Sequence, residues 1–156
     1  MRPLIPAAFV AALLPMSALA DAGHDHGDAR AYGRPGDPAK PARTVEVVLT
    51  DADDGAMRFE PNAITVARGE QIRFVLKNTG RIDHEFMLAT RADNDRHAAA
   101  MRKNPDMEHD DPNGRRLAPG TSADLLWRFS NAGAFNFACL IPGHREAGMD
   151  GAVAVK

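Results

Sequence analysis

The sequence predicts an all-β fold, a Greek-key sandwich of about eight strands with a short helical insert. Three observations lead to this prediction. Apolar and polar residues alternate with a period of two over short segments, turn residues such as Gly, Pro and Asn separate these segments, and one long stretch departs from the pattern. Of the 156 residues, 44% are hydrophobic and 26% are charged, which suits one globular domain with its own core.

The clearest expected strand covers residues 71–78. There Ile72, Phe74 and Leu76 fall on one face and Arg73 on the other, as in a strand that packs on one side. The other expected strands are 44–50, 63–69, 84–90, 124–130, 134–140 and 151–156.

Residues 91–118 interrupt the strand pattern. The segment "RHAAAMRK" within them has the composition of a helix, with Asp93 or Asn94 as the expected N-cap and Pro105 as the stop. We therefore expect an inserted helix and a loop between two strands.

The N-terminus has the features of an export signal. Arg2 supplies a positive start, 4–14 are apolar, and Ala18-Leu19-Ala20 offers small residues for cleavage. The apolar run is too short for a membrane anchor. We expect a signal peptide at 1–20, cleavage after Ala20, a periplasmic location and no membrane insertion of the mature chain.

Residues 21–43 are rich in Gly, Pro, Asp and Ala, so we expect a flexible arm there and a folded domain over 44–156. The arm carries His24 and His26. The net charge of −2 is too small to indicate nucleic acid or an anionic membrane as a partner.

The only cysteine, Cys139, lies in the segment "CLIPGHREAGM" with His144 and Met149. Exported proteins normally pair their cysteines, so a single one indicates a ligand, a reactive thiol or a buried inert side chain. A thiolate, an imidazole and a thioether on one tight loop suit copper. A blue-copper centre needs one Cys, two His and a weak axial Met.

The second histidine is expected to be His84, because it opens a strand directly after a turn. Loops at one end of a Greek-key sandwich cluster in space, so this position can face the loop after Cys139. Taken singly, His84 suits a surface residue, His144 a turn and Met149 the core. Their combination with Cys139 favours a copper site.

Two other kinds of site are less compatible with these residues. Zinc prefers four firm ligands, and a thioether is a poor one. A Cys–His nucleophile needs an orienting acid and an oxyanion hole, and the sequence marks neither. We expect no enzyme, with oxidation of cuprous ion at the centre as the one reaction left open.

The motifs "DHEF" at 83–86 and "FACLIPGHREAGM" at 137–149, with the closing segment 151–156, resemble those of the cupredoxins, the plastocyanin and azurin superfamily. The resemblance covers 44–156. It implies an eight-stranded Greek-key sandwich with one type 1 copper. The implied copper ligands are His84, Cys139, His144 and Met149.

The chain departs from the family pattern in two ways. Four residues separate Cys139 from His144, as in azurins, where plastocyanins usually have two, and four separate His144 from Met149, where azurins have three. Glu85 stands where a small amide or hydroxyl residue often supports the Cys sulfur. The resemblance also implies that a redox partner protein docks on an apolar patch around His144.

Weaker copper candidates lie outside this set: His24, His26, His97, Met101, Met107 and His109. The pair on the arm can bind Cu(II) loosely, or it belongs to a solvated polar tail; both interpretations stand. A helix would place His97 and Met101 on one face, as a Cu(I) site requires. We favour the alternative that Met101 and Met107 pack the insert onto the sandwich.

Three functions follow. The insert and the His-bearing arm resemble a narrower group, the periplasmic cupredoxins associated with copper tolerance, so we expect copper binding and redox cycling in that role. The alternative is a soluble electron shuttle between respiratory partners, and a metal-free binding sandwich ranks third.

Overall fold

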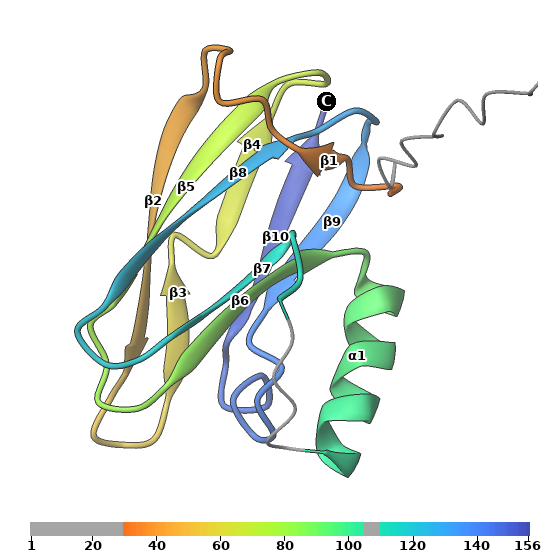
Figure 1. Ribbon diagram of the computed structural model, residues 1–156. Coiled ribbons are helices and arrows are strands. Elements are labelled where there is room, and N and C mark those ends of the chain that lie inside the picture. The colour runs from red at the N-terminus through yellow and green to blue at the C-terminus, as the bar shows by residue number, and fades with distance from the viewer. Residues whose placement is uncertain (1–29, 105–109) are drawn as a thin grey trace, which may run out of the picture.

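The computed structural model describes residues 30–104 and 110–156. It is a sandwich of two five-stranded sheets with one helix at its side, which confirms the expected fold class (Figure 1). The first sheet has the order β1-β8-β5-β2-β3, and the second β4-β10-β9-β6-β7. The strands are β1 Arg34–Pro35, β2 Arg43–Asp51, β3 Met57–Glu60, β4 Ala63–Val66, β5 Gln71–Asn78, β6 His84–Ala89, β7 Gly114–Leu117, β8 Ser122–Arg128, β9 Gly133–Ala138 and β10 Asp150–Val155.

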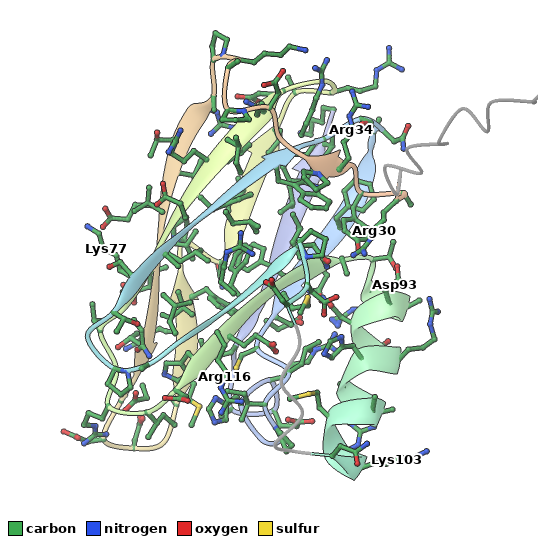
Figure 2. All side chains as sticks on the ribbon, in the orientation of Figure 1. Arg30, Arg34, Lys77, Asp93, Lys103 and Arg116 are labelled. Atoms are coloured by element: carbon green, nitrogen blue, oxygen red, sulfur yellow. The ribbon has the colours of Figure 1, made fainter. Side chains whose placement is uncertain are left out.

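Alternating side chains fill the space between the sheets. In β5, Ile72, Phe74 and Leu76 are buried, as the sequence predicts, while Arg73 is exposed. Phe86 of β6 stacks on Phe137 of β9, with ring centroids 4.9 Å apart. Charged side chains such as Lys77 and Lys103 point outward (Figure 2).

The second sheet brings the starts of some strands beside the ends of others. β6 and β9 are antiparallel neighbours, with Met87 opposite Ala138. The start of β6 therefore lies at the same end of the sandwich as the end of β9. The segment between β9 and β10 emerges at this end too.

Three strands were not expected from the sequence: β1, β3 and β7. Each is an edge strand of two to four residues and each contains arginine. Short, charged edge strands limit pairing with other chains, but they lack the alternating pattern that identifies a strand in a sequence. The sandwich therefore has ten strands instead of about eight.

Residues 30–43 differ from the flexible arm expected there. Tyr32 is buried, its ring stacks on Trp127 at 5.6 Å, and its carbonyl oxygen accepts a hydrogen bond from Trp127 Nε1. Gly33 has a φ of 115°, and a Cβ there would lie 2.0 Å from the carbonyl oxygen of Arg128. One aromatic side chain and a close backbone approach thus order a segment whose average composition is that of an arm.

The insert contains helix α1, Arg91–Lys103, between β6 and β7. Its N-cap is Thr90, whose Oγ1 accepts a hydrogen bond from the backbone N–H of Asp93 at 3.1 Å. The expected caps, Asp93 and Asn94, lie inside the first turn instead, so this prediction was wrong. Thr90 at the end of a strand satisfies the capping position three residues earlier.

Several sequence predictions lie outside the described residues: the signal peptide at 1–20, the arm up to residue 29, His24 and His26, and the segment 105–109 with Pro105, Met107 and His109. Within the part of the chain that is described, no helix has the length and apolarity needed to cross a bilayer.

Candidate metal centre

His84 and Cys139 meet at one end of the second sheet. His84 is the first residue of β6, and Cys139 directly follows the last residue of β9. The backbone N–H of Glu85 donates to Cys139 Sγ at 3.3 Å. Both side chains are fully buried. The antiparallel pairing of the two strands thus brings together residues that are 55 positions apart.

The segment 139–149 folds back on itself and carries His144 to the same place. The N–H of His144 donates to the carbonyl of Ile141, and that of Met149 to the carbonyl of His144, both at 3.1 Å. Gly143 has a φ of 89°, which suits glycine in this turn. Nδ1 of His144 lies 3.4 Å from Sγ of Cys139. The His144 residue as a whole is partly exposed to solvent.

A backbone hydrogen bond joins Met149 to Cys139. Its carbonyl accepts a hydrogen bond from the Cys139 N–H at 3.2 Å. Its side chain is fully buried and belongs to the same apolar cluster as Cys139. The segment 139–149 therefore begins and ends at one point of the sandwich.

The three donor atoms fit a single metal ion. Nδ1 of His84 and Nδ1 of His144 are 3.3 Å apart, and the donor atoms of His84, Cys139 and His144 all lie within 4.8 Å of one another. Three donors about 2 Å from a common centre in a trigonal plane are about 3.5 Å apart. One thiolate sulfur and two imidazole nitrogens are the main donors of a type 1 copper centre, and the buried Met149 belongs to the same apolar cluster as Cys139.

A carboxylate on β2 orients His84. Asp51 Oδ1 lies 3.2 Å from Nε2 of His84, and the Asp51 side chain is only 6% exposed. Nε2 donates to this carboxylate, so Nδ1 is left with its lone pair toward Cys139 and His144. The backbone N–H of Arg81, its guanidinium and His84 hold the pKa of Asp51 at about 2.

Gly80 leaves the room for this contact. A Cβ at this position would lie 2.0 Å from Asp51 Oδ1 and 2.9 Å from His84 Nε2. The turn before β6 therefore needs glycine because the packing is close. It does not need glycine for its backbone conformation, since the φ of Gly80 is not in the left-handed region.

Glu85 ties the two strands together beside the sulfur. Its side chain is buried, and its Oε2 accepts a hydrogen bond from the Leu140 N–H at 3.2 Å. Its own N–H donates to Cys139 Sγ. The residue that departs from the family pattern thus holds the backbone on the far side of Cys139.

Burial sets the protonation of the two loop residues. It raises the pKa of the Cys139 thiol to about 12. It lowers the pKa of His144, and the nearby His84 lowers that pKa further. At neutral pH the centre without metal therefore contains a thiol and a neutral His144, so binding a metal as thiolate requires loss of a proton.

A model of copper-binding proteins, described as the plastocyanin/azurin family, matches residues 46–156. The chain belongs to this family. It is 55% identical to the copper-resistant cuproprotein CopI of Rubrivivax gelatinosus over 94% of this chain and 93% of that protein. The CopI of Pseudomonas aeruginosa is 36% identical over 99% and 98%.

A comparison of structures places this cupredoxin beside auracyanin B, with a TM-score of 0.63 and 26% identity over 80% of this chain and 96% of that one. An auracyanin from Roseiflexus castenholzii has a TM-score of 0.59 and 21% identity, over 75% and 99% of the two chains, and shares the fold.

The remaining described candidates lie on the helix of this cupredoxin. Met101 is buried against Met87, Ala138 and Leu140, as expected if it packs the insert onto the sandwich. His97 is partly buried and lines a separate cavity of about 370 Å³. Neither side chain is among the three grouped donors of the described residues.

Sequence reasoning missed Asp51 and Gly80 as supports of the centre. Gly80 lies in an expected turn, and Asp51 follows an expected strand by one residue. Each residue is already accounted for by its turn or strand end, so neither stands out in the sequence. Their proximity to His84 depends on the contact between β2 and the turn before β6, which no local sequence pattern shows.

Proposed function

We propose that this cupredoxin holds one copper ion at a type 1 centre formed by His84, Cys139 and His144, with Met149 as the weak axial ligand. It cycles this copper between two oxidation states in the periplasm as part of copper tolerance. The observation that carries the proposal is the buried group of one sulfur and two imidazole nitrogens within 4.8 Å.

The surroundings of the centre suit a change of oxidation state. His84 and Cys139 are fixed by paired strands, and Glu85 and Asp51 hold the backbone and the imidazole by hydrogen bonds. A close-packed site of this kind keeps its ligand positions when the charge of the ion changes.

The relatives favour copper tolerance. Two of them are named copper-resistant cuproproteins, and their similarity extends over nearly the whole of both chains. The export signal expected at 1–20 fits a protein that meets copper outside the cytoplasm. His24 and His26, in the expected arm, fit a further, weaker contact with copper.

An electron shuttle is the second candidate, and the exposure of His144 favours it. This residue is partly exposed, Pro142 beside it is exposed, and Ile82 in the turn before β6 is 41% exposed. A partly exposed imidazole, with exposed apolar residues in its own turn and in the turn before β6, offers a docking surface for a redox partner protein.

Two experiments test these functions. Cu(II) is titrated into the mature chain, with Cys139→Ser as the test variant and His97→Gln as a control that removes an imidazole outside the centre. We expect one tightly bound copper with an intense thiolate-to-copper absorption band in the wild type and His97→Gln, and no such band in Cys139→Ser. A wild type without the band would favour a metal-free sandwich.

Growth on copper separates tolerance from the shuttle. A strain without the gene should grow poorly at copper concentrations that the parent tolerates, and the wild-type gene should restore growth while Cys139→Ser should not. Normal growth of the deletion strain on copper would instead support the shuttle.

A further inference from the structure

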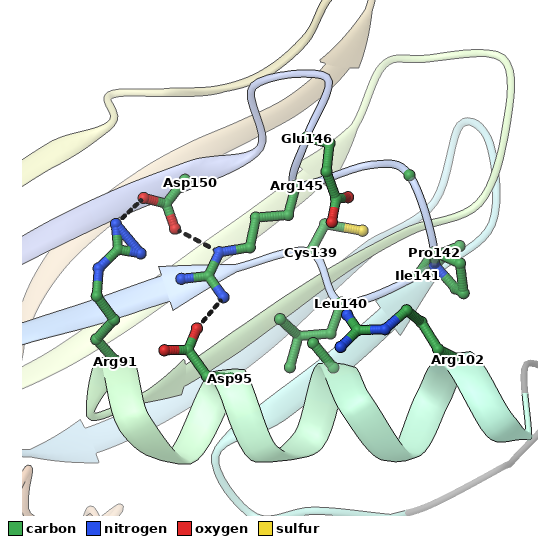
Figure 3. Close-up of a pocket in the computed structure, with 12 residues that line it drawn as sticks. Arg91, Asp95, Arg102, Cys139, Leu140, Ile141, Pro142, Arg145, Glu146 and Asp150 are labelled. Atoms are coloured by element: carbon green, nitrogen blue, oxygen red, sulfur yellow. Dashed lines mark hydrogen bonds and ion pairs between the residues drawn. The ribbon is translucent and has the colours of Figure 1, made fainter.

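Arg145 directly follows His144 and turns toward helix α1. Its side chain is only 16% exposed. Nη1 pairs with Asp95 of α1 at 2.7 Å, and Nε pairs with Asp150 at 3.0 Å (Figure 3). A guanidinium next to a candidate copper ligand thus joins the helical insert to the start of β10.

The contacts continue back to the helix. Asp150 Oδ2 pairs with Nη2 of Arg91 at 3.1 Å. Arg91 and Asp95 are four residues apart and therefore share one face of α1. The four side chains form a closed path from the helix to the segment 139–149 and back (Figure 3). We call these residues, Arg91, Asp95, Arg145 and Asp150, the clamp.

The clamp holds the neighbours of two candidate ligands. Arg145 follows His144, and Asp150 follows Met149. Asn136 of β9 also donates to Asp150 Oδ1 at 3.0 Å, which ties this carboxylate to the sheet. Cys139 is positioned by its strand, whereas His144 lies in a turn whose contacts to the rest of the protein include the clamp.

The energetics of Arg145 suggest a role other than stability. Its Nη2 is buried and has no hydrogen-bond partner within residues 30–104 and 110–156. The side chain also borders a cavity of about 530 Å³ between α1 and the segment 139–149. The Asp95 side chain is 59% exposed, and ion pairs with a solvent-exposed partner contribute little to stability.

We propose that Arg145 is a positioning residue, and that the clamp makes helix α1 a brace that fixes His144 and Met149 relative to Cys139. The expected effect of the clamp on the geometry of bound copper rests on the proposed copper centre. The mechanical part of the inference, the ordering of the segment 139–149 by the helix, concerns the protein without metal as well.

The first test uses hydrogen exchange in the copper-free protein. The variants are Arg145→Met, which keeps an unbranched apolar side chain but removes the guanidinium, and Asp95→Asn, which removes the negative charge on the helix. Arg73→Met is the control, because Arg73 forms a similar ion pair with Asp124 at 3.0 Å on the other sheet. The reporters are the amides of Cys139, Ala147 and Met149, which are hydrogen-bonded within the segment.

We expect these amides to exchange about tenfold faster in Arg145→Met and in Asp95→Asn, and at the wild-type rate in Arg73→Met. The double variant should exchange no faster than Arg145→Met alone, because Arg145→Met already removes the contact that Asp95→Asn weakens. Unchanged exchange in both clamp variants would overturn the proposal. So would an effect of Arg145→Met without one of Asp95→Asn, since Arg145 would then act without the helix.

The second test uses copper. In Asp95→Asn and Arg145→Met we expect changed relative intensities of the visible bands and a changed copper hyperfine splitting, with wild-type values in Arg73→Met. Spectra identical to the wild type in both clamp variants would contradict the brace. A wild type that shows no thiolate-to-copper band would refute the copper centre itself. Hydrogen exchange would still decide whether the helix orders the segment 139–149.

Discussion

His84 takes its orientation from contacts that one glycine permits. We expect Gly80→Ala to push Asp51 away from Nε2 of His84, because the new Cβ would lie 2.0 Å from the carboxylate oxygen. Loss of a carboxylate behind a metal-binding histidine lowers metal affinity about 10- to 100-fold. A competition titration against a copper chelator measures this.

The control for Gly80→Ala is Asp53→Asn, in the turn that follows Asp51. Asp53 is exposed and pairs with Arg81, but it does not contact His84. This variant should bind copper as the wild type does. An affinity of Gly80→Ala equal to that of the wild type would show that the contact between Asp51 and His84 is not needed.

Copper binding should release a proton from Cys139. The pKa of this thiol is raised to about 12 by burial, so the thiol is protonated in the copper-free protein at pH 7 to 9, whereas a bound thiolate is not. His144 has a lowered pKa and is neutral there, so it contributes no proton. We expect about one proton released per copper, and an affinity that rises about tenfold per pH unit in this range.

Calorimetric titrations in buffers of different ionisation enthalpy measure the released protons. Because burial raises the pKa of Cys139 to about 12, the thiol of the copper-free protein keeps its proton at neutral pH. A higher pH therefore favours the copper-bound form. Release of no proton would mean that copper binds without the thiolate.

At the scale of elements, the central strands and the edge strand β4 could be predicted, whereas the other three edge strands could not. β5 is identified by its alternating apolar residues, which are buried because they face the second sheet, where Phe74 packs on Phe86 of β6. β3 and β7 carry little alternation, since an edge strand packs only in part. Their positions depend on pairing with β2 and β6, which is a property of the assembled sheet.

The candidate centre was predicted to a similar degree. Cys139, His144 and Met149 share one short segment, and it is their combination there that indicates a site. His84 required an argument about topology, and the structure brings it to Cys139. Asp51, Gly80 and the clamp could not be predicted, because each acts through a contact with a distant segment.

Residues 30–43 provide a test of element boundaries. Tyr32 belongs to the main apolar cluster and stacks on Trp127. We expect Tyr32→Ala to lower the free energy of unfolding by about 3 kcal/mol, as for other large aromatic side chains removed from a core. Chemical denaturation of the copper-free protein measures this change.

Tyr32→Phe is the matched control for that variant. It removes only the hydroxyl that accepts a hydrogen bond from Arg30, which is worth about 1 kcal/mol or less. If Tyr32→Ala cost no more than Tyr32→Phe, the N-terminal segment would contribute little to the fold.

At the scale of the whole molecule, the centre exists only in the folded chain. The centre combines Asp51 from the first sheet with His84 and the segment 139–149 from the second. In an unfolded chain no contact holds these distant segments together. The fold places Nδ1 of His144 3.3 Å from Nδ1 of His84 and 3.4 Å from Sγ of Cys139, and all three donor atoms lie within 4.8 Å of one another before any metal arrives. Such a preformed, buried site binds the ion in the geometry that the protein dictates.

The most direct test is a crystal structure of the copper-loaded mature chain, with anomalous scattering at the copper edge to locate the metal. The structure predicts one strong copper peak between Nδ1 of His84, Nδ1 of His144 and Sγ of Cys139, on the side where Met149 is buried. A single peak elsewhere, such as at His24 and His26, with the three donors unbound, would contradict the account.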